Sequence, residues 1–389
     1  MKNNLSIRFI WALTAFILMI LAACQSVPKE EKPSILFISS FQDSVDAGLV
    51  LISLDPDSLN GEKVQTLGGQ PTPSYFDFHP SKKYFYVAAS DPVNPNEKGG
   101  SVVSYSIDTM KGRMEYINSV PSYCLNPCHV SNDHTGRYIF ISSYGSGSLV
   151  VYPILENGRL GDSLQLIQFT GQSVNPDRQS KPHAHSSLVS NDNEILYVAD
   201  LGTDKIMVFE FDESNGKLKP ALHPWISCSA GGGPRHMALH PELDILYVAE
   251  ELSSSISVFN TGKIREDGAD AIQRVTTLPS DFTERNSVAD IHISPDGKFV
   301  YVSNRGHQSI AIFKTDPEDG SLSQVRHQST LGNSPRSFSL SSDASLLLAA
   351  NRRTSNITAF RRNPEDGILE ETGREFHISK PICIKFVKN

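Results

Sequence analysis

The sequence has few tryptophans, few cysteines and no run of basic residues. Of its 389 residues, 2 are tryptophan and 5 are cysteine, so the chain is not a disulfide-rich scaffold. In an oxidising compartment Cys124 and Cys128 can form a bridge, but we expect mostly buried thiols. Acidic residues (43) outnumber basic residues (35), and the formal net charge of −8 argues against nucleic acid as a partner.

The first residues are typical of a targeting segment rather than of a folded domain. Lys2 and Arg8 precede an apolar run that ends in Leu-Ala-Ala and is followed by Cys24, the pattern of a signal peptide with a lipidation site. An uncleaved membrane helix is the alternative, but the run is short for a membrane span. We therefore expect a signal peptide over 1–23, lipidation of Cys24 as a membrane anchor, and a polar tether over 24–33. The expected location is the cell envelope, on a periplasmic or outer-membrane face.

A repeated apolar pattern fills the remaining chain, 34–389. Long stretches with the 3.6-residue period of a helix are missing, whereas short runs rich in β-branched and aromatic residues recur about every 50 residues. One marker position in each run is occupied by Ile38, Val87, Ile141, Val198, Val248, Val302 and Ala349. Seven such units predict an all-β, seven-bladed β-propeller, and two tryptophans are too few for a propeller of the Trp-Asp repeat type.

The unit at 291–326 indicates how many strands a blade contains. Two apolar strands flank a Pro-Asp-Gly turn, a third strand alternates apolar and polar residues, and a polar edge strand follows. We therefore expect four antiparallel strands per blade, with the first strand innermost. The run 381–387 resembles an innermost strand without successors, and the run 35–39 resembles a second strand without a predecessor. Pairing of these two strands is expected to close the ring.

Polar residues gather at the two blade positions that face the channel of such a ring. The starts of the predicted innermost strands hold Cys128, His129, His183, His185, Arg235, His236, His292 and Arg336. The ends of the predicted second strands hold Ser90, Tyr144, Leu201, Glu251, Arg305 and Arg352. Arginine binds carbonyl, carboxylate or phosphate groups through two hydrogen bonds, and a nearby Glu or His can move protons. These residues therefore predict a site for such groups in the channel.

Structural roles remain an open alternative for these side chains. We expect a histidine to recur at one blade position, where its ring can bond the backbone of the neighbouring blade; these histidines are His129, His185, His236 and His292. The arginines can form ion pairs. No metal is expected, because neither His-Ala-His nor Gly-Gly-Gly-Pro-Arg-His has zinc-ligand spacing. No cofactor is expected either. Residues 231–234 lack the lysine and helix of a phosphate-binding loop, and the sequence has no Gly-x-Ser-x-Gly elbow.

Several segments resemble the lactonase family of seven-bladed propellers, which includes 6-phosphogluconolactonases and carboxy-muconate lactonising enzymes. The most specific are PHAH at 182–185, GPRH at 233–236 and SNRGH at 303–307, within a resemblance that spans 128–386. The resemblance implies catalytic roles for His185, Arg235, Glu251 and Arg305. We expect substrate-binding roles for His183, His236, His292 and Arg352.

We accordingly expect hydrolysis of a sugar lactone. Arg235 and Arg305 would bind the carbonyl and an anionic group, while Glu251 or His185 activates water. Glu250 replaces the usual asparagine of the family, and we expect it to raise the pKa of Glu251 or to repel an anionic substrate.

The substrate and the reaction class stay open at this level. Ala89-Ser90 replaces the Asn-Glu that the family usually has, and export favours a non-phosphorylated lactone at least as much as the phosphorylated one. A lactone cycloisomerase is one alternative. A non-catalytic surface propeller that binds a glycan or a protein is another.

Overall fold

The computed structural model describes residues 34–41, 47–55, 58–68, 71–92, 99–108, 112–266 and 270–387. They fall within one folding unit, Ser34–Asn389. The expected signal peptide, the lipidation site at Cys24 and the tether lie outside the described residues. Within the described ranges, no helix has the length and apolar character needed to cross a membrane.

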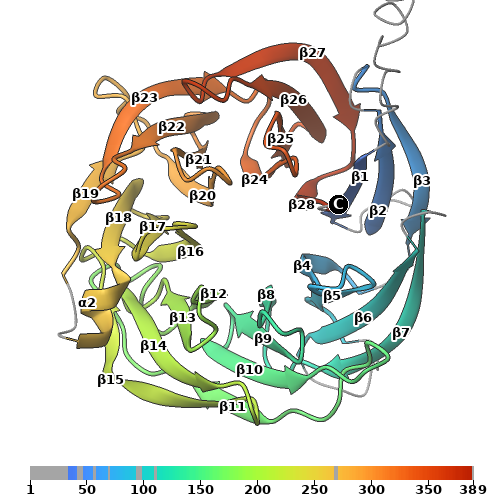
Figure 1. Cartoon of the computed structure of the whole chain (residues 1–389), viewed down its shortest axis with the longest axis vertical. Coiled ribbons are helices and arrows are strands. Elements are labelled where there is room, and N and C mark those ends of the chain that lie inside the picture. The colour runs from blue at the N-terminus through green and yellow to red at the C-terminus, as the bar shows by residue number, and fades with distance from the viewer. Residues whose placement is uncertain are drawn as a thin grey trace, which may run out of the picture. The chain divides into compact units, whose positions relative to one another are not determined.

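Seven four-stranded antiparallel sheets stand around a central axis (Figure 1). In six sheets the strands follow chain order from the axis outward. The first three of these sheets consist of β4 (Pro73–Phe78), β5 (Tyr84–Ala89), β6 (Ser101–Asp108) and β7 (Arg113–Pro121); β8 (Pro127–Asn132), β9 (Tyr138–Ser143), β10 (Ser148–Pro153) and β11 (Gln165–Gln168); and β12 (Ala184–Val189), β13 (Ile195–Asp200), β14 (Lys205–Asp212) and β15 (Lys217–Ser227). The other three consist of β16 (Pro234–Leu239), β17 (Ile245–Glu250), β18 (Ser255–Asn260) and β19 (Gln273–Thr276); β20 (Ser287–Ile293), β21 (Phe299–Arg305), β22 (Ser309–Thr315) and β23 (Leu322–Ser329); and β24 (Pro335–Leu340), β25 (Leu346–Asn351), β26 (Asn356–Arg362) and β27 (Leu369–His377).

The seventh sheet is built from both ends of the described chain. Its innermost strand is β28 (Pro381–Phe386), followed outward by β1 (Ser34–Ser40), β2 (Leu49–Leu54) and β3 (Gly61–Leu67). β28 and β1 are antiparallel. The predicted propeller, with four strands per blade and a ring closed by the terminal strands, is therefore confirmed.

Apolar side chains of the second strands hold neighbouring blades together. The seven marker residues lie on β1, β5, β9, β13, β17, β21 and β25, and each is at most 2% exposed. Val198 packs in one cluster with Phe140 of the preceding blade, and Val248 packs in another with Tyr197. Burial of one such side chain contributes about 1.5–3 kcal/mol. The four cysteines of the described part are buried free thiols, as expected, namely Cys124, Cys128, Cys228 and Cys383.

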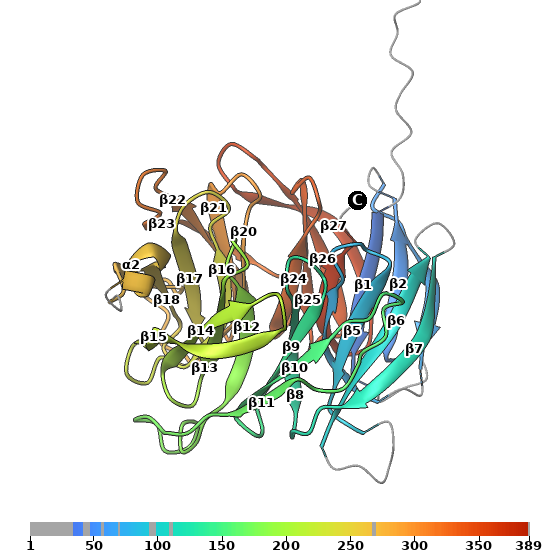
Figure 2. The same ribbon diagram turned by 60° about the horizontal axis from the view of Figure 1, so that its bottom comes forward.

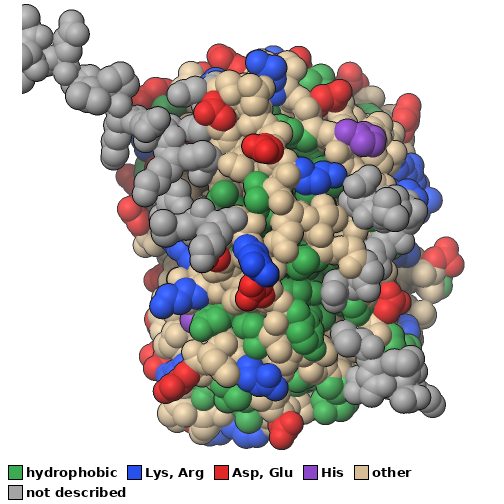
Figure 3. All heavy atoms as spheres, turned by 90° about the vertical axis from the view of Figure 1, so that its right-hand side faces the viewer, with side chains coloured by type: hydrophobic (Ala, Val, Ile, Leu, Met, Phe, Trp, Pro, Cys, Tyr) green, Lys and Arg blue, Asp and Glu red, His purple; other side chains and the backbone are tan. Residues whose placement is uncertain are grey.

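Polar side chains cover the outer strands. β3 is mostly exposed, whereas β1 of the same blade is mostly buried. The tilted view shows the outer strands forming the wall of the ring, with α2 (Thr261–Glu266) on that wall after β18 (Figure 2). On the face near β3 and β7, acidic and basic side chains are interspersed with apolar ones (Figure 3).

Every innermost strand has a β-bulge near its first residues. The pairing register with the second strand shifts there, so that one residue, or two on β20, leaves the regular ladder. A bulge bends the strand and turns a side chain in a new direction. The residues at these shifts are Ser74, Cys128, His185, Arg235, Ala289 with Asp290, Arg336 and Ile382. The bulges thereby determine which side chains reach one mouth of the channel.

Candidate active site

One mouth of the central channel contains a cavity of about 300 Å³. Five of the bulged residues line it, namely Ser74, Cys128, His185, Arg336 and Ile382. Residues that end or follow second strands also line it, among them Ser90, Tyr144, Glu251, Arg305 and Arg352. The two predicted channel-facing positions therefore do meet in one cavity, although Leu201 is fully buried and does not line it.

Glu251 is the centre of an ion-pair network in this cavity. Its Oε2 accepts a hydrogen bond from Nε of Arg235 at 3.0 Å and lies 2.9 Å from Nη2 of Arg305. Its Oε1 accepts a hydrogen bond from Nη2 of Arg178 at 2.8 Å. One carboxylate thus balances three guanidinium groups, and the network retains a net positive charge.

The arginines also determine the protonation of Glu251. Burial opposes ionisation, but the charges of Arg305 and Arg235 outweigh it and lower the pKa of Glu251 to about 2. The expectation that Glu250 raises this pKa is wrong. The Glu250 carboxylate is occupied elsewhere, by hydrogen bonds from the backbone of Ser229 and the hydroxyls of Ser253, Ser255 and Ser257.

Two further arginines of the cavity have unused hydrogen-bond donors. Within the described residues, the guanidinium groups of Arg336 and Arg352 have no hydrogen bond or ion pair, and that of Arg352 lies 4.5 Å from the ring centre of Phe41. Burial, and then the charges of Arg235 and Arg305, lower the pKa of Arg336 to about 9. Arg336 therefore stays cationic at neutral pH, and a bound anion would relieve the repulsion between these groups.

His185 lines the same cavity as an uncharged imidazole. Burial first, and then the positive charge of Arg235, lower the pKa of His185 well below its ordinary value. Its ring packs edge-on against Tyr144 and His236, with ring centres 5.6 and 5.4 Å apart. A neutral imidazole can accept a proton, which is the property a general base requires.

Arg235 and His183 support the cavity from outside its lining. The side chain of Arg235 is 2% exposed and donates to the backbone oxygen of Ala289 as well as to Glu251. The ring of His183 stacks on Tyr144 with centres 4.3 Å apart, and its Nδ1 lies 2.7 Å from the backbone oxygen of Tyr144. These two predicted site residues contact residues of the cavity and are not among those that line it.

The remaining predicted histidines lie deeper in the channel. His236 is buried, and His292 lines a second cavity at the opposite mouth. The expectation of one recurring histidine position is wrong. The strand registers make His129 equivalent to His236, whereas His185 occupies the bulge one residue earlier and His292 stands two pairing positions later.

Arg178 was not predicted. It lies on the connection between β11 and β12, donates to Glu251, and has Nη2 3.3 Å from the hydroxyl of Tyr144. A connection has no strand periodicity, so the only signal was its place within the span 128–386 that resembles the family. Arg336 was noted at a channel position but was assigned no role.

No metal centre is formed by the part of the chain that the structure describes. Groups of three or more His, Cys, Asp or Glu side chains in metal-binding proximity are missing from these ranges. The ionisable side chains that line the cavity include arginines, the imidazole of His185 and the carboxylate of Glu251.

The fold and this cavity are those of a class of propeller enzymes, and comparisons with known proteins lead to the same class. Residues 35–386 match the model of the family described as lactonase, 7-bladed beta-propeller. The chain belongs to this lactonase family. It is 31% identical over 307 residues to a 6-phosphogluconolactonase of Bacillus subtilis (strain 168), a match that covers 77% of this chain and 83% of that protein.

A second relative and a solved structure agree with this assignment. The chain is 34% identical over 251 residues to a 6-phosphogluconolactonase of Erwinia tasmaniensis, covering 64% of this chain and 69% of that protein. The structure of the periplasmic gluconolactonase of Pseudomonas aeruginosa superposes with a TM-score of 0.83 and 26% identity, covering 91% of this chain and 99% of that one.

Proposed function

We propose that this protein hydrolyses the ring ester of a sugar lactone that carries an anionic group. The observation that carries the proposal is the composition of the cavity. The uncharged His185 lies in one cavity with Arg336 and Arg352, whose donors are free within the described chain. The names of the Bacillus subtilis relative and of the Pseudomonas aeruginosa neighbour support the same reaction class.

The catalytic step uses these residues in distinct roles. His185 takes a proton from water, and the resulting hydroxide adds to the lactone carbonyl. Arg305 stabilises the oxyanion that forms. The bond between the carbonyl carbon and the ring oxygen then breaks, and the ring oxygen takes the proton back from His185, which yields the open-chain hydroxy acid.

Glu251 has a supporting role in this proposal. A carboxylate whose pKa is about 2 is a weak base at neutral pH. It holds Arg178, Arg235 and Arg305 by direct contacts of at most 3.0 Å. Because both oxygens of Glu251 already contact arginines, we assign the general base to His185, which lines the cavity, and Glu251 holds the arginines in place.

The positive charge of the cavity favours an anionic substituent on the lactone. A phosphate or a carboxylate would pair with Arg336 and Arg352 through charge-assisted hydrogen bonds. The test is a comparison at pH 6 of three lactones, namely neutral gluconolactone, 6-phosphogluconolactone and an aldaric acid lactone with a free carboxylate. Acceleration of an anionic lactone supports the proposal, while no acceleration of any lactone favours a propeller that only binds its ligand.

We also propose that the chain is a lipoprotein of the cell envelope. Residues 1–23 would be the signal peptide, Cys24 the lipidated residue, 24–33 the tether and 34–389 the lactonase domain. The periplasmic location named for the Pseudomonas aeruginosa neighbour supports an envelope location. Fractionation tests this: the protein should move from the membrane fraction to a soluble fraction in Cys24→Ser.

A further inference from the structure

Four contacting side chains fill the channel beneath His185. Tyr75, His129 and His236 occupy the position that follows the bulge on β4, β8 and β16, and Asp290 is the second of the two bulged residues on β20. Tyr75 stacks on His129 with ring centres 4.4 Å apart, and His236 contacts both rings edge-on at 5.7 and 5.5 Å. We call these four residues the plug. The plug separates the cavity around His185 from the opposite mouth.

Asp290 is the only carboxylate of the plug. It is 2% exposed, and its Oδ1 accepts a hydrogen bond from Nδ1 of His236 at 2.7 Å. Backbone N–H groups of Ile291 and Phe338 donate to it at 3.2 and 3.4 Å, and Nε2 of His292 lies 3.4 Å from its Oδ2. Burial opposes its ionisation, but His292 and His236 outweigh burial and lower the pKa of Asp290 well below its ordinary value.

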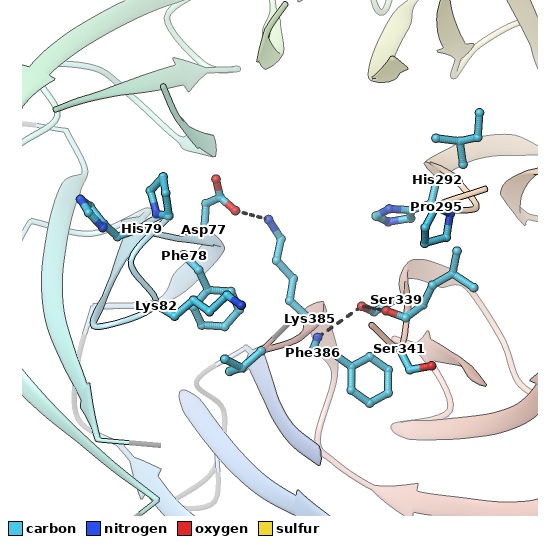
Figure 4. A pocket seen from close by; sticks show the side chains of 14 residues that line it. Asp77, Phe78, His79, Lys82, His292, Pro295, Ser339, Ser341, Lys385 and Phe386 are labelled. Carbon is cyan, nitrogen blue, oxygen red and sulfur yellow. Dashed lines mark hydrogen bonds and ion pairs between the residues drawn. The ribbon is translucent and has the colours of Figure 1, made fainter. Parts of the chain in front are cut away.

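The opposite mouth already balances its own charges. Figure 4 shows Lys385 reaching towards Asp77, with Nζ 2.7 Å from Oδ1, while the ring of His292 faces the same cavity from another blade. The ammonium of Lys385 also lies 4.7 Å from the ring centre of Tyr75. Asp77 is therefore a carboxylate with a cation in contact. Asp290 has no lysine or arginine in contact within the described residues; it faces the imidazoles of His236 and His292, and burial and then Arg235 lower the pKa of His236 to about 4.

The reaction proposed above places a positive charge on His185. Its surroundings oppose that charge, because Arg235, Arg305 and Arg336 face it. The titratable groups that face His185 are Cys128 on β8, Tyr144 after β9, Arg235 and His236 on β16, Glu251 after β17, Arg305 on β21 and Arg336 on β24. Glu251 is the carboxylate of this set, and three arginines share it. The next carboxylate inward is Asp290, one side chain away through His236.

We propose that Asp290 is a positioning residue of the active site: it fixes the His236 ring on which His185 packs, and its charge stabilises the His185 imidazolium during turnover. The hydrogen bond makes Nδ1 of His236 the protonated nitrogen, so the orientation of this ring is set by Asp290. The pairing is comparable in kind to the carboxylate that orients a catalytic histidine in hydrolases, with one further imidazole between the two. This inference rests on the proposed lactone hydrolysis.

The kinetic test uses Asp290→Asn in the full-length protein, assayed with the lactone that the unchanged protein hydrolyses best. We expect kcat to fall on the order of tenfold to a hundredfold, with KM within about twofold, because the arginines that hold the substrate are untouched. Loss of the negative charge makes the His185 imidazolium less stable, so the acid limb of the kcat profile moves to lower pH by about one unit. A merely structural residue would not move that limb.

Asp77→Asn is the matched control. It makes the same substitution on an innermost strand, but at the opposite mouth and beside its own cation, Lys385. We expect the kcat and the acid limb of this variant to match those of the unchanged protein. An Asp290→Asn variant that retains the full kcat, or loses kcat and thermal stability without any shift of the limb, overturns the proposal.

A second measurement does not depend on turnover. Imidazole ¹⁵N resonances of the unchanged protein should show His236 protonated at Nδ1, and titration should show a lower pKa for His185 in Asp290→Asn, with His185→Gln used for assignment. Unchanged His185 titration overturns the role of Asp290 even if no lactone is hydrolysed. Absence of hydrolysis by the unchanged protein, with the titration shift present, overturns the proposed function and the kinetic role while leaving the charge coupling established.

Discussion

The Nε of Arg235 lies 3.0 Å from Oε2 of Glu251, and the two side chains are only 2% and 7% exposed. Removing one partner of a buried ion pair leaves an uncompensated charge and costs about 3–5 kcal/mol. We therefore expect Glu251→Gln to lower the free energy of unfolding by this amount at pH 7, as measured in urea. The control is Glu213→Gln, which breaks an exposed pair with Arg137 and should cost at most about 1 kcal/mol.

The pKa of Glu251 makes the same pair sensitive to acid. Its pKa is about 2 in the folded protein and 4.5 ordinarily, so the stabilisation is complete above 4.5 and is lost as the pH falls from 4.5 towards 2. The difference in unfolding free energy between the unchanged protein and Glu251→Gln should therefore shrink over this window. A difference that stays constant down to the lower pH would show that the carboxylate does not stabilise the fold through its charge.

Replacement of His185 tests the general base. His185→Gln keeps a polar side chain in the cavity but cannot accept the proton, so kcat for the preferred lactone should fall by about 10² to 10⁴. His240→Gln is a suitable control, because His240 contacts the backbone of Gly297 and is not among the residues that line either mouth. Equal activity of the two variants would contradict the assignment.

The unpaired arginines of the cavity predict that the protein discriminates between anionic and neutral lactones. Arg336→Ala should raise KM for an anionic lactone about 10- to 100-fold, which is the effect of losing one charge-assisted hydrogen bond. A neutral lactone should be affected much less. Arg353→Ala is the matched control, since Arg353 is an exposed neighbour of Arg352 that does not line the cavity. Equal losses for both lactones would place Arg336 in catalysis or folding instead.

Removal of residues 380–389 tests the closure of the ring. It would delete β28 and leave β1 unpaired on its inner edge. Exposed strand edges promote aggregation, so the truncated protein should be insoluble or should melt far below the full-length protein. Deletion of 25–32, which lies before β1, should leave the melting temperature unchanged. A truncated protein with the parental melting temperature would mean that the seventh blade does not need its innermost strand.

The fold was predictable from the sequence because the same strand pattern is repeated from blade to blade. Val198 and Val248 stand in nearly identical runs, ILYVAD and ILYVAE, and both are buried at the same position of a second strand. A repeat of this kind specifies strand order and blade number without long-range information. The cavity was predictable in part for the same reason, since Glu251 and Arg305 follow their marker residues at equal distance.

The direction of individual side chains was not predictable. His185 and Arg235 occupy equivalent bulge positions, yet His185 lines the cavity and Arg235 is buried beneath it. No single residue type marks the bulged positions, which hold Ser, Cys, His, Arg, Ala, Asp and Ile. Arg178 reaches Glu251 from a connection, and only the folded chain brings these two residues together.

The seventh blade has a consequence for the order of synthesis. β1 is the first strand of the described chain and β28 is the last, so β1 leaves the ribosome long before its inner partner exists. Domains usually begin to fold while the chain is still being made, yet β28 follows the strands of the other six blades in the sequence and is made after all of them. The nascent propeller must therefore wait as an open arc, with β1 unpaired on its inner side, until β28 is available to pair with it.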